Sequence, residues 1–94
     1  MNTNFEHYRI FYYVAKYGNL TKAATVLHTS QPYVTRTIHN LEPNLKYRLF
    51  ERSKVGMKLT PEGEVFYEYI AAGCAQFFKA ESNLSDMLSL ENGT

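Results

Sequence analysis

A chain of 94 residues, 45% of them hydrophobic, has room for one small domain and one further element. No apolar stretch reaches the ~18 residues that a membrane-spanning helix needs, and the first residues lack the basic-then-apolar pattern of a signal peptide. The single cysteine, Cys74, cannot form an intramolecular disulfide, which fits a reducing compartment. We therefore expect a cytoplasmic protein that makes no contact with a membrane.

The net charge of +1 hides an uneven distribution of charge along the chain. Residues 1–60 contain nine lysines and arginines against three acids, a net charge of +6, whereas residues 61–94 contain one lysine against six acids, a net charge of −5. A basic segment is suited to a polyanion, although ordinary solvated charge would give the same count. The division predicts a domain over residues 1–60, a separate segment over 61–91 and a tail at 92–94.

Two helices are predicted in the first part of the chain. The segment Thr3–Glu6 has the pattern of a capping box with Thr3 as the N-cap, and Gly18 provides a left-handed end to the helix that follows. Apolar residues recur in this helix at helical spacing: Phe5, Tyr8, Phe11, Tyr12 and Ala15. Thr21 is then expected to cap a second, short helix over Lys22–Leu27, whose small Ala23 and Ala24 allow a close neighbour.

A third helix is predicted after a turn at His28 and Thr29. Ser30 is a favourable N-cap, and Pro32 falls in the first turn, where its missing amide proton is not needed. We expect the helix to extend to about Leu41 and to be ended by Pro43 and Asn44. Two helices joined by such a tight turn are typical of a helix-turn-helix.

A β-hairpin is predicted next, from strands at Leu49–Arg52 and Met57–Thr60 joined by a turn at Ser53–Gly56. Its basic residues, Arg52, Lys54 and Lys58, would make it a basic wing. Because a two-stranded ribbon is only marginally stable alone, we expect its apolar residues to pack on the helices.

The last predicted element is a long helix over Glu62–Leu90, with Thr60 as its cap and Pro61 at its first position. A helix of this length would span roughly 43 Å at ~1.5 Å per residue, too long to be one wall of so small a domain. Its apolar residues alternate at spacings of four and three, as in a coiled-coil seam: Phe66, Ile70, Gly73, Phe77, Ala80, Leu84 and Met87. We expect a second copy of the chain to cover this seam, giving a homodimer, although packing against its own domain remains the alternative.

The first turns of the third helix have the side chains that a DNA-reading helix needs. Gln pairs with adenine, Arg with guanine, and Thr contacts base edges or the thymine methyl group. The expected base contacts are Gln31, Pro32, Tyr33, Thr35 and Arg36, with Arg52 from the wing. The expected phosphate contacts are Thr21, Lys22, Thr29, Ser30, His39, Lys54 and Lys58.

The same residues resemble a known family. The pattern consists of Ala23-Ala24, Leu27, Ser30-Gln31-Pro32, Val34, Ile38, Leu41-Glu42, Leu45, Leu49-Phe50, Arg52, Leu59-Thr60 and Gly63. It is similar to the DNA-binding half of LysR-type transcriptional regulators over about residues 5–90. The resemblance implies a mainly α fold: a winged helix-turn-helix of three helices and a two-stranded wing, followed by a long linker helix. It further implies an antiparallel pairing of linker helices, binding to an interrupted palindrome in promoter DNA, and Arg52 as a minor-groove arginine.

The chain departs from this family at two positions and in length. Lys46 stands where glycine is usual, and Tyr33 where a small residue is usual. The effector-binding domain that follows in the family is expected to be absent, and a tetramer would be expected only where such a domain follows.

Other function classes find little support in the sequence. His7, His28 and His39 are not spaced as metal ligands, and no catalytic triad or phosphate loop is present. We therefore expect neither an enzyme nor a metal or organic cofactor. The remaining alternative to a nucleoid-associated DNA-binding regulator is a winged-helix module that binds an acidic protein partner.

Overall fold

The computed structural model describes residues 4–91 as four helices and one hairpin. They follow in the order α1 (Phe5–Tyr17), α2 (Leu20–Leu27), α3 (Gln31–Leu45), β1 (Phe50–Ser53), β2 (Gly56–Leu59) and α4 (Pro61–Glu91). The predicted winged helix-turn-helix with a long final helix is confirmed. The predicted tail at residues 92–94 lies outside the described residues.

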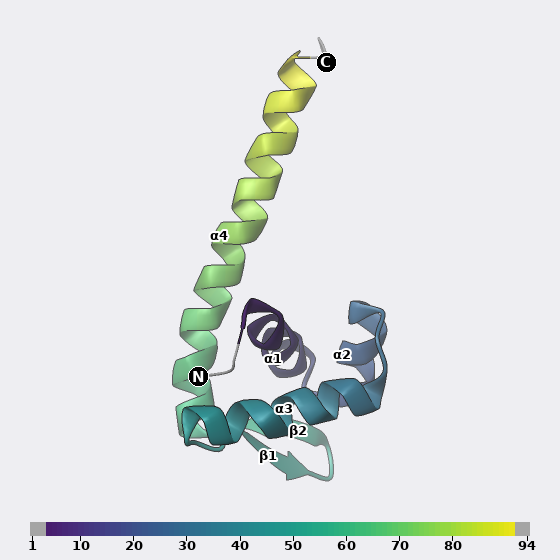
Figure 1. Ribbon diagram of the computed structural model, residues 1–94, viewed down its shortest axis with the longest axis vertical. Coiled ribbons are helices and arrows are strands. Elements are labelled where there is room, and N and C mark those ends of the chain that lie inside the picture. Colours follow the sequence, from purple (N-terminus) through teal and green to yellow (C-terminus); the bar gives the residue numbers. More distant parts are fainter. Residues whose placement is uncertain (1–3, 92–94) are drawn as a thin grey trace.

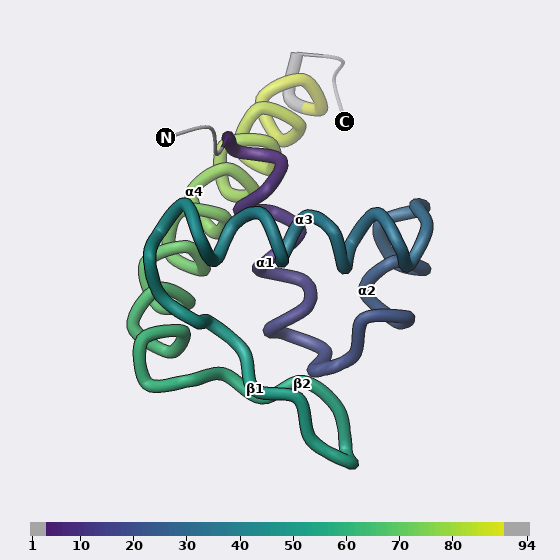
Figure 2. The backbone as a smooth tube through the Cα atoms, turned by 60° about the horizontal axis from the view of Figure 1, so that its bottom comes forward, coloured from purple at the N-terminus to yellow at the C-terminus, as the bar shows by residue number. Residues whose placement is uncertain are grey.

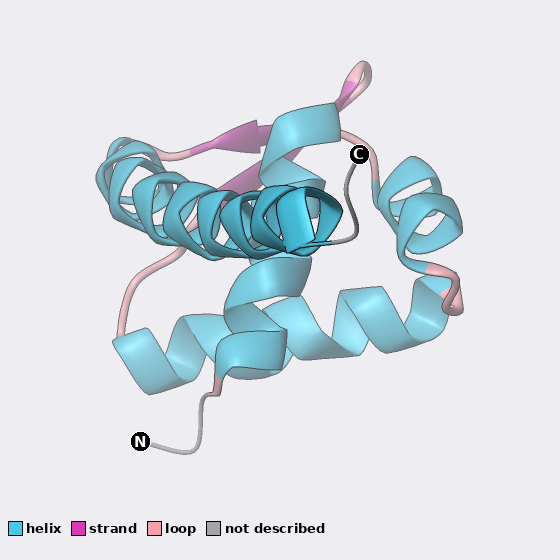
Figure 3. Cartoon of the chain, turned by 90° about the horizontal axis from the view of Figure 1, so that it is seen from above, coloured by secondary structure: helices cyan, strands magenta, loops and turns pink. Residues whose placement is uncertain are grey.

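The domain is built around α1, which lies between α3 and the hairpin. Figure 3 looks along α4 and shows α3 and the hairpin on opposite sides, with α2 beside the start of α3. Helix α1 lies close to α2, α3, β2 and α4. The ring of its Phe11 contacts the rings of Phe50 and Phe66, at 5.3 and 5.0 Å between centroids. The core residues are Ile10, Phe11, Val14, Ala23, Ala24, Val34, Ile38, Leu41, Leu49 and Phe50.

The N-terminal ends of the first two helices differ from the prediction. The N-cap of α1 is Asn4, whose side chain accepts from the amide of His7, rather than Thr3, which lies outside the described residues. The N-cap of α2 is Asn19, which accepts from the amide of Lys22, so the predicted Thr21 cap is wrong. Asparagine is a somewhat better N-cap than threonine, and the two caps are one residue after Thr3 and two residues before Thr21.

The end of α3 also differs from the prediction, because Pro43 lies inside the helix rather than ending it. A proline near the end of a helix removes only one of the last hydrogen bonds. The helix ends at Lys46, which adopts the left-handed conformation (φ 65°, ψ 24°) and donates its amide to the carbonyl of Pro43 (3.1 Å). Lys46, at the position where the sequence comparison expected glycine, is thus a left-handed cap.

The hairpin strands lie close to the predicted ranges, with β1 shifted one residue later and β2 one residue earlier at both ends. Their antiparallel register pairs Phe50 with Leu59 and Ser53 with Gly56. Leu49 and Phe50 are buried against the helices and Leu59 is partly buried, as expected for a ribbon that depends on tertiary packing.

Helix α4 begins at Pro61 and is joined to the hairpin through Thr60. The Thr60 hydroxyl donates to the carbonyl of Arg48 (2.6 Å) and accepts from the amide of Gly63 (2.9 Å), which confirms the predicted cap. From there α4 runs along α1 and then projects beyond the domain, as Figure 1 shows, so that the molecule measures 51 × 25 × 23 Å. The part of α4 up to Phe78 packs on the domain, where Phe77 and Phe78 contact aromatic rings of α1.

Candidate nucleic-acid interface

The helix-turn-helix depends on close packing between α2 and α3. Ala23 and Ala24 are buried at this contact, which lets the helices approach each other. His28 ends α2 in the left-handed conformation (φ 58°), and the amide of Thr29 donates to the carbonyl of Ala24 at 3.0 Å. The turn at His28 and Thr29 is confirmed.

The start of α3 presents one polar face to solvent. Ser30 accepts from the amide of Tyr33 (3.3 Å), which confirms the predicted cap, and Pro32 lies in the first turn. The opposite face is buried through Val34, Thr37, Ile38 and Leu41. That burial leaves Pro32, Tyr33, Arg36 and His39 exposed.

Two of the predicted base-reading residues are joined to each other. The side-chain amide Nε2 of Gln31 donates to the hydroxyl of Thr35 at 2.8 Å, one helical turn apart. Both residues are half-buried, so their contact restricts the rotamers that either side chain adopts. The carbonyl oxygen Oε1 of Gln31 remains available as an acceptor and the hydroxyl proton of Thr35 as a donor, so the pair can bind one ligand together.

The cations of this face have no acidic partner. Among residues 4–91 the structure has one ion pair, between Arg9 and Glu6 at 3.7 Å. Arg36 and Arg52 are exposed, and no carboxylate of the described residues lies at ion-pair distance from either. An unpaired guanidinium keeps its five donors for a phosphate or for the edge of a guanine.

The hairpin carries the other predicted cations, and Arg52, Lys54 and Lys58 are all exposed. In the register of the two strands, Lys58 lies opposite Glu51. Val55, at the tip of the hairpin, is 96% exposed. The hairpin is fastened to the end of α1 by a hydrogen bond from the amide of Met57 to the carbonyl of Gly18 (3.0 Å), which sets its distance from the helix-turn-helix.

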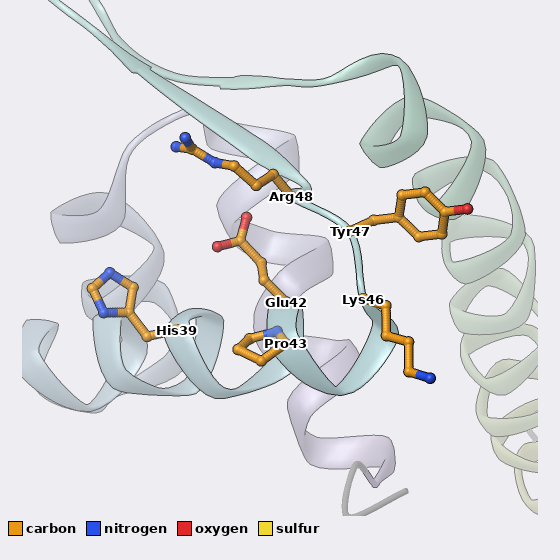
Figure 4. Close-up of a pocket in the computed structure, with 6 residues that line it drawn as sticks. All are labelled: His39, Glu42, Pro43, Lys46, Tyr47 and Arg48. Carbon is orange, nitrogen blue, oxygen red and sulfur yellow. The ribbon is translucent and has the colours of Figure 1, made fainter.

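The predicted phosphate contacts lie around the helix-turn-helix rather than in one cluster. Thr21 and Lys22 are exposed in the first turn of α2, whereas Thr29 is half-buried in the turn. His39 is exposed further along α3, where it borders the hollow drawn in Figure 4.

Glu42 has a structural role that the sequence did not indicate. Its carboxylate oxygen Oε2 accepts from the amides of Leu49 (2.7 Å) and Phe50 (3.1 Å), so it ties α3 to the start of β1. Figure 4 shows Glu42 pointing toward the connection between the two elements, with Arg48 nearby and Lys46 directed away. Hydrogen bonds to a charged acceptor are stronger than neutral ones, so this carboxylate stabilises the position of the wing relative to α3.

The residues of the predicted seam on α4 fall into two groups. Phe66 and Ile70 pack against the core of their own domain, and Phe77 contacts the ring of Phe5 at 4.6 Å between centroids. Gly73, Ala80, Leu84 and Met87 are exposed, Leu84 by 68%. The free stripe also includes Val65 and Tyr69, which the predicted seam omits; Tyr69 is 75% exposed.

The described residues contain neither a candidate metal site nor a membrane-spanning helix. Within residues 4–91 no group of three or more His, Cys, Asp or Glu side chains is arranged to hold a metal ion. None of the described helices is both long and apolar enough to span a membrane. Cys74 is buried between α1 and α4, and this burial raises the pKa of its thiol.

Residues 5–64, well over half of the chain, match the family described as bacterial regulatory helix-turn-helix protein, lysR family. The chain belongs to the LysR family. Among curated LysR relatives it is 49% identical to the HTH-type transcriptional regulator YofA of Bacillus subtilis, over 65% of this chain and 21% of that protein. It is 39% identical to the HTH-type transcriptional regulator BenM of Acinetobacter baylyi, over 89% of this chain and 25% of that protein. The chain thus spans about a quarter or less of the length of these relatives.

Crystal structures of LysR proteins with DNA have the same architecture. The complex of the BenM DNA-binding domain with catB site 1 DNA covers 96% of this chain and 93% of that chain, with 37% identity and a TM-score of 0.70. The complex of the CbnR DNA-binding domain with DNA covers 90% of this chain and 98% of that chain, with 33% identity and a TM-score of 0.75. The fold of this LysR chain is therefore that of a DNA-binding domain with its long final helix.

Proposed function

We propose that this chain is the DNA-binding part of a transcriptional regulator that recognises promoter DNA in the cytoplasm, at the nucleoid. The observation that carries the proposal is the exposed polar face at the start of α3, in a fold that matches DNA-bound relatives. Arg36 on this face has no acidic partner among residues 4–91. In this arrangement α3 enters the major groove and the hairpin reaches the neighbouring minor groove.

Different side chains of α3 recognise different base pairs. Arg36 donates to O6 and N7 of a guanine, and the joined Gln31 and Thr35 read a second base pair through Oε1 and the hydroxyl. Tyr33 adds an exposed ring beside them, which gives this chain a contact that a small residue would not make. Arg52 on the hairpin enters the minor groove, while Lys54, Lys58 and the start of α2 contact phosphates.

We also propose that α4 joins two copies of the chain. The exposed stripe of Tyr69, Gly73, Ala80, Leu84 and Met87 continues beyond the end of the domain, and an antiparallel partner helix would cover it. The absence of a side chain at Gly73, where nothing lies within 4 Å of a built Cβ, lets the helices come close. A twofold axis through this contact sets two copies of α3 at a fixed separation, which favours an interrupted palindrome as the binding site. A tetramer becomes possible where an effector-binding domain follows.

The test compares the base preferences of two variants on duplexes enriched from a random pool. Arg36→Ala is expected to weaken binding to the preferred sequence by about 1–3 kcal/mol and to relax the choice at one base pair in each half-site. Lys22→Ala, the matched control, is expected to weaken all sequences alike. A wild-type chain that enriches no sequence, or that binds an acidic protein in preference to any duplex, would contradict the proposal.

A further inference from the structure

Three tyrosine rings on α1 contact three cationic side chains. The rings of Tyr13 and Tyr17 stack at 6.2 Å between centroids and 13° between planes. The ammonium of Lys22 lies 5.1 Å from the centroid of Tyr17, and that of Lys16 lies 5.7 Å from the same centroid. Lys16 is also 5.9 Å from the ring of Tyr12. The third cation, Arg9, lies over Tyr13 at 5.8 Å.

The two lysines at Tyr17 have no acid to neutralise them. Glu6, the acid nearest along α1, is engaged by Arg9, and that is the only ion pair within residues 4–91. The electron-rich ring of Tyr17 attracts both ammonium groups, but it does not neutralise their charge. Both ammonium groups are held at the same ring and neither is paired with a carboxylate of residues 4–91, so both remain available to bind an anion.

The position of this pair in the fold indicates which anion. The carbonyl of Gly18, next to Tyr17, accepts from the amide of Met57 on the hairpin. Figure 2 shows the connection from α1 to α2 lying between α2 and the hairpin. A duplex that places its major groove on α3 and the adjacent minor groove on the hairpin carries the intervening strand past this connection. The anion at hand is therefore a phosphate of the DNA backbone.

We propose that Lys16, Tyr17 and Lys22 form a clamp for one backbone phosphate of the strand that separates the two grooves. The inference rests on the proposed function and adds Lys16 and Tyr17 to the contacts expected from the sequence. Lys16 and Lys22 bind the phosphate from two helices. Tyr17 is a positioning residue: its ring, fixed by stacking on Tyr13, holds both ammonium groups in place before DNA arrives.

The test is the salt dependence of binding to a mixed-sequence DNA duplex, because a phosphate contact is independent of sequence. Lys16→Ala is expected to reduce the slope of log affinity against log salt by about one for each subunit bound. Tyr17→Phe keeps the ring and is expected to bind as the wild type does, whereas Tyr17→Leu is expected to bind about two- to fivefold more weakly. Lys79→Ala, which removes an exposed lysine of α4, is the control and leaves the slope unchanged.

A combined variant separates positioning from a general effect on folding. In a Lys16→Ala, Lys22→Ala background, Tyr17→Leu is expected to cause no further loss of affinity, because no ammonium group remains to be held. A Lys16→Ala variant with the wild-type slope would overturn the clamp, and so would a Tyr17→Leu loss that is equally large in the background without the lysines. A wild-type chain that binds neither the mixed-sequence duplex nor a selected one would instead overturn the proposed function.

Discussion

Two glycines of α4 should respond in opposite directions to the same substitution. A Cβ built on Gly63 would overlap the backbone carbonyl of Leu49, whereas a Cβ built on Gly73 has nothing within 4 Å. Overpacking costs about 1–3 kcal/mol. The cost at Gly63 should lie at the upper end of this range, because the backbone of Leu49 would have to move rather than one flexible side chain. Replacing a helical glycine with alanine also stabilises the helix by about 1 kcal/mol, because alanine has the higher helix propensity.

Gly63→Ala is therefore expected to lower the free energy of unfolding by about 2 kcal/mol, and Gly73→Ala to raise it by about 0.5–1 kcal/mol. For a domain of this size these changes correspond to a loss of roughly 8–16 °C in melting temperature for the first variant and a gain of roughly 2–8 °C for the second. Urea unfolding followed by circular dichroism, at concentrations where the chain is monomeric, measures both. A Gly63→Ala variant as stable as the wild type would refute the close approach of α4 to Leu49.

The approach of α4 to Leu49 matters for function because it sets the angle at which α4 leaves the domain. In the proposed dimer that angle determines the distance between the two copies of α3. Gly63→Ala is thus also expected to weaken binding to a palindromic duplex by more than it weakens binding to a single half-site, measured by fluorescence anisotropy. Equal losses on the two duplexes would contradict the role of this contact in spacing.

Three further changes test other parts of the fold. Lys46→Gly removes the strain of a side chain in the left-handed conformation and should raise the free energy of unfolding by about 0.5–1 kcal/mol, which raises the melting temperature by a few degrees. Lys46→Ala keeps a side chain in that conformation and should not stabilise the domain. Glu42→Ala leaves the amides of Leu49 and Phe50 without their acceptor and should cost about 2–3 kcal/mol in urea unfolding, with Glu42→Gln intermediate. Burial raises the pKa of Cys74, so the stability that its neutral thiol contributes is present at neutral pH and is lost as the pH rises through the folded-state pKa. Cys74→Ala should therefore reduce the loss of stability at alkaline pH, measured as the urea midpoint against pH.

The helices and the recognition surface could be predicted because their signals are local. Ser30 and Pro32 mark the start of α3 within a few residues, and the buried positions Val34, Ile38 and Leu41 recur at helical spacing. The positions left over on the opposite face, including Arg36, then follow from the helical period alone.

The details that the sequence misplaced depend on competition or on distant contacts. Asn19 and Thr21 are both favourable caps by residue type, and in the folded domain α2 begins after Asn19, with Leu20 packed against the core. The two hydrogen bonds of Glu42 join residues seven and eight positions apart in the sequence and exist only in the folded domain. In the same way, Phe66 lies on the predicted seam, but only the tertiary structure shows that α1 covers it.

The most direct test of the account is selection of bound DNA by the wild-type chain from a pool of random duplexes. The proposed dimer, with its two copies of α3 related by a twofold axis, predicts enrichment of an inverted repeat whose half-sites keep one fixed spacing. Enrichment of a single asymmetric element would contradict the pairing through α4. A pool that remains unenriched would contradict sequence-specific recognition by α3.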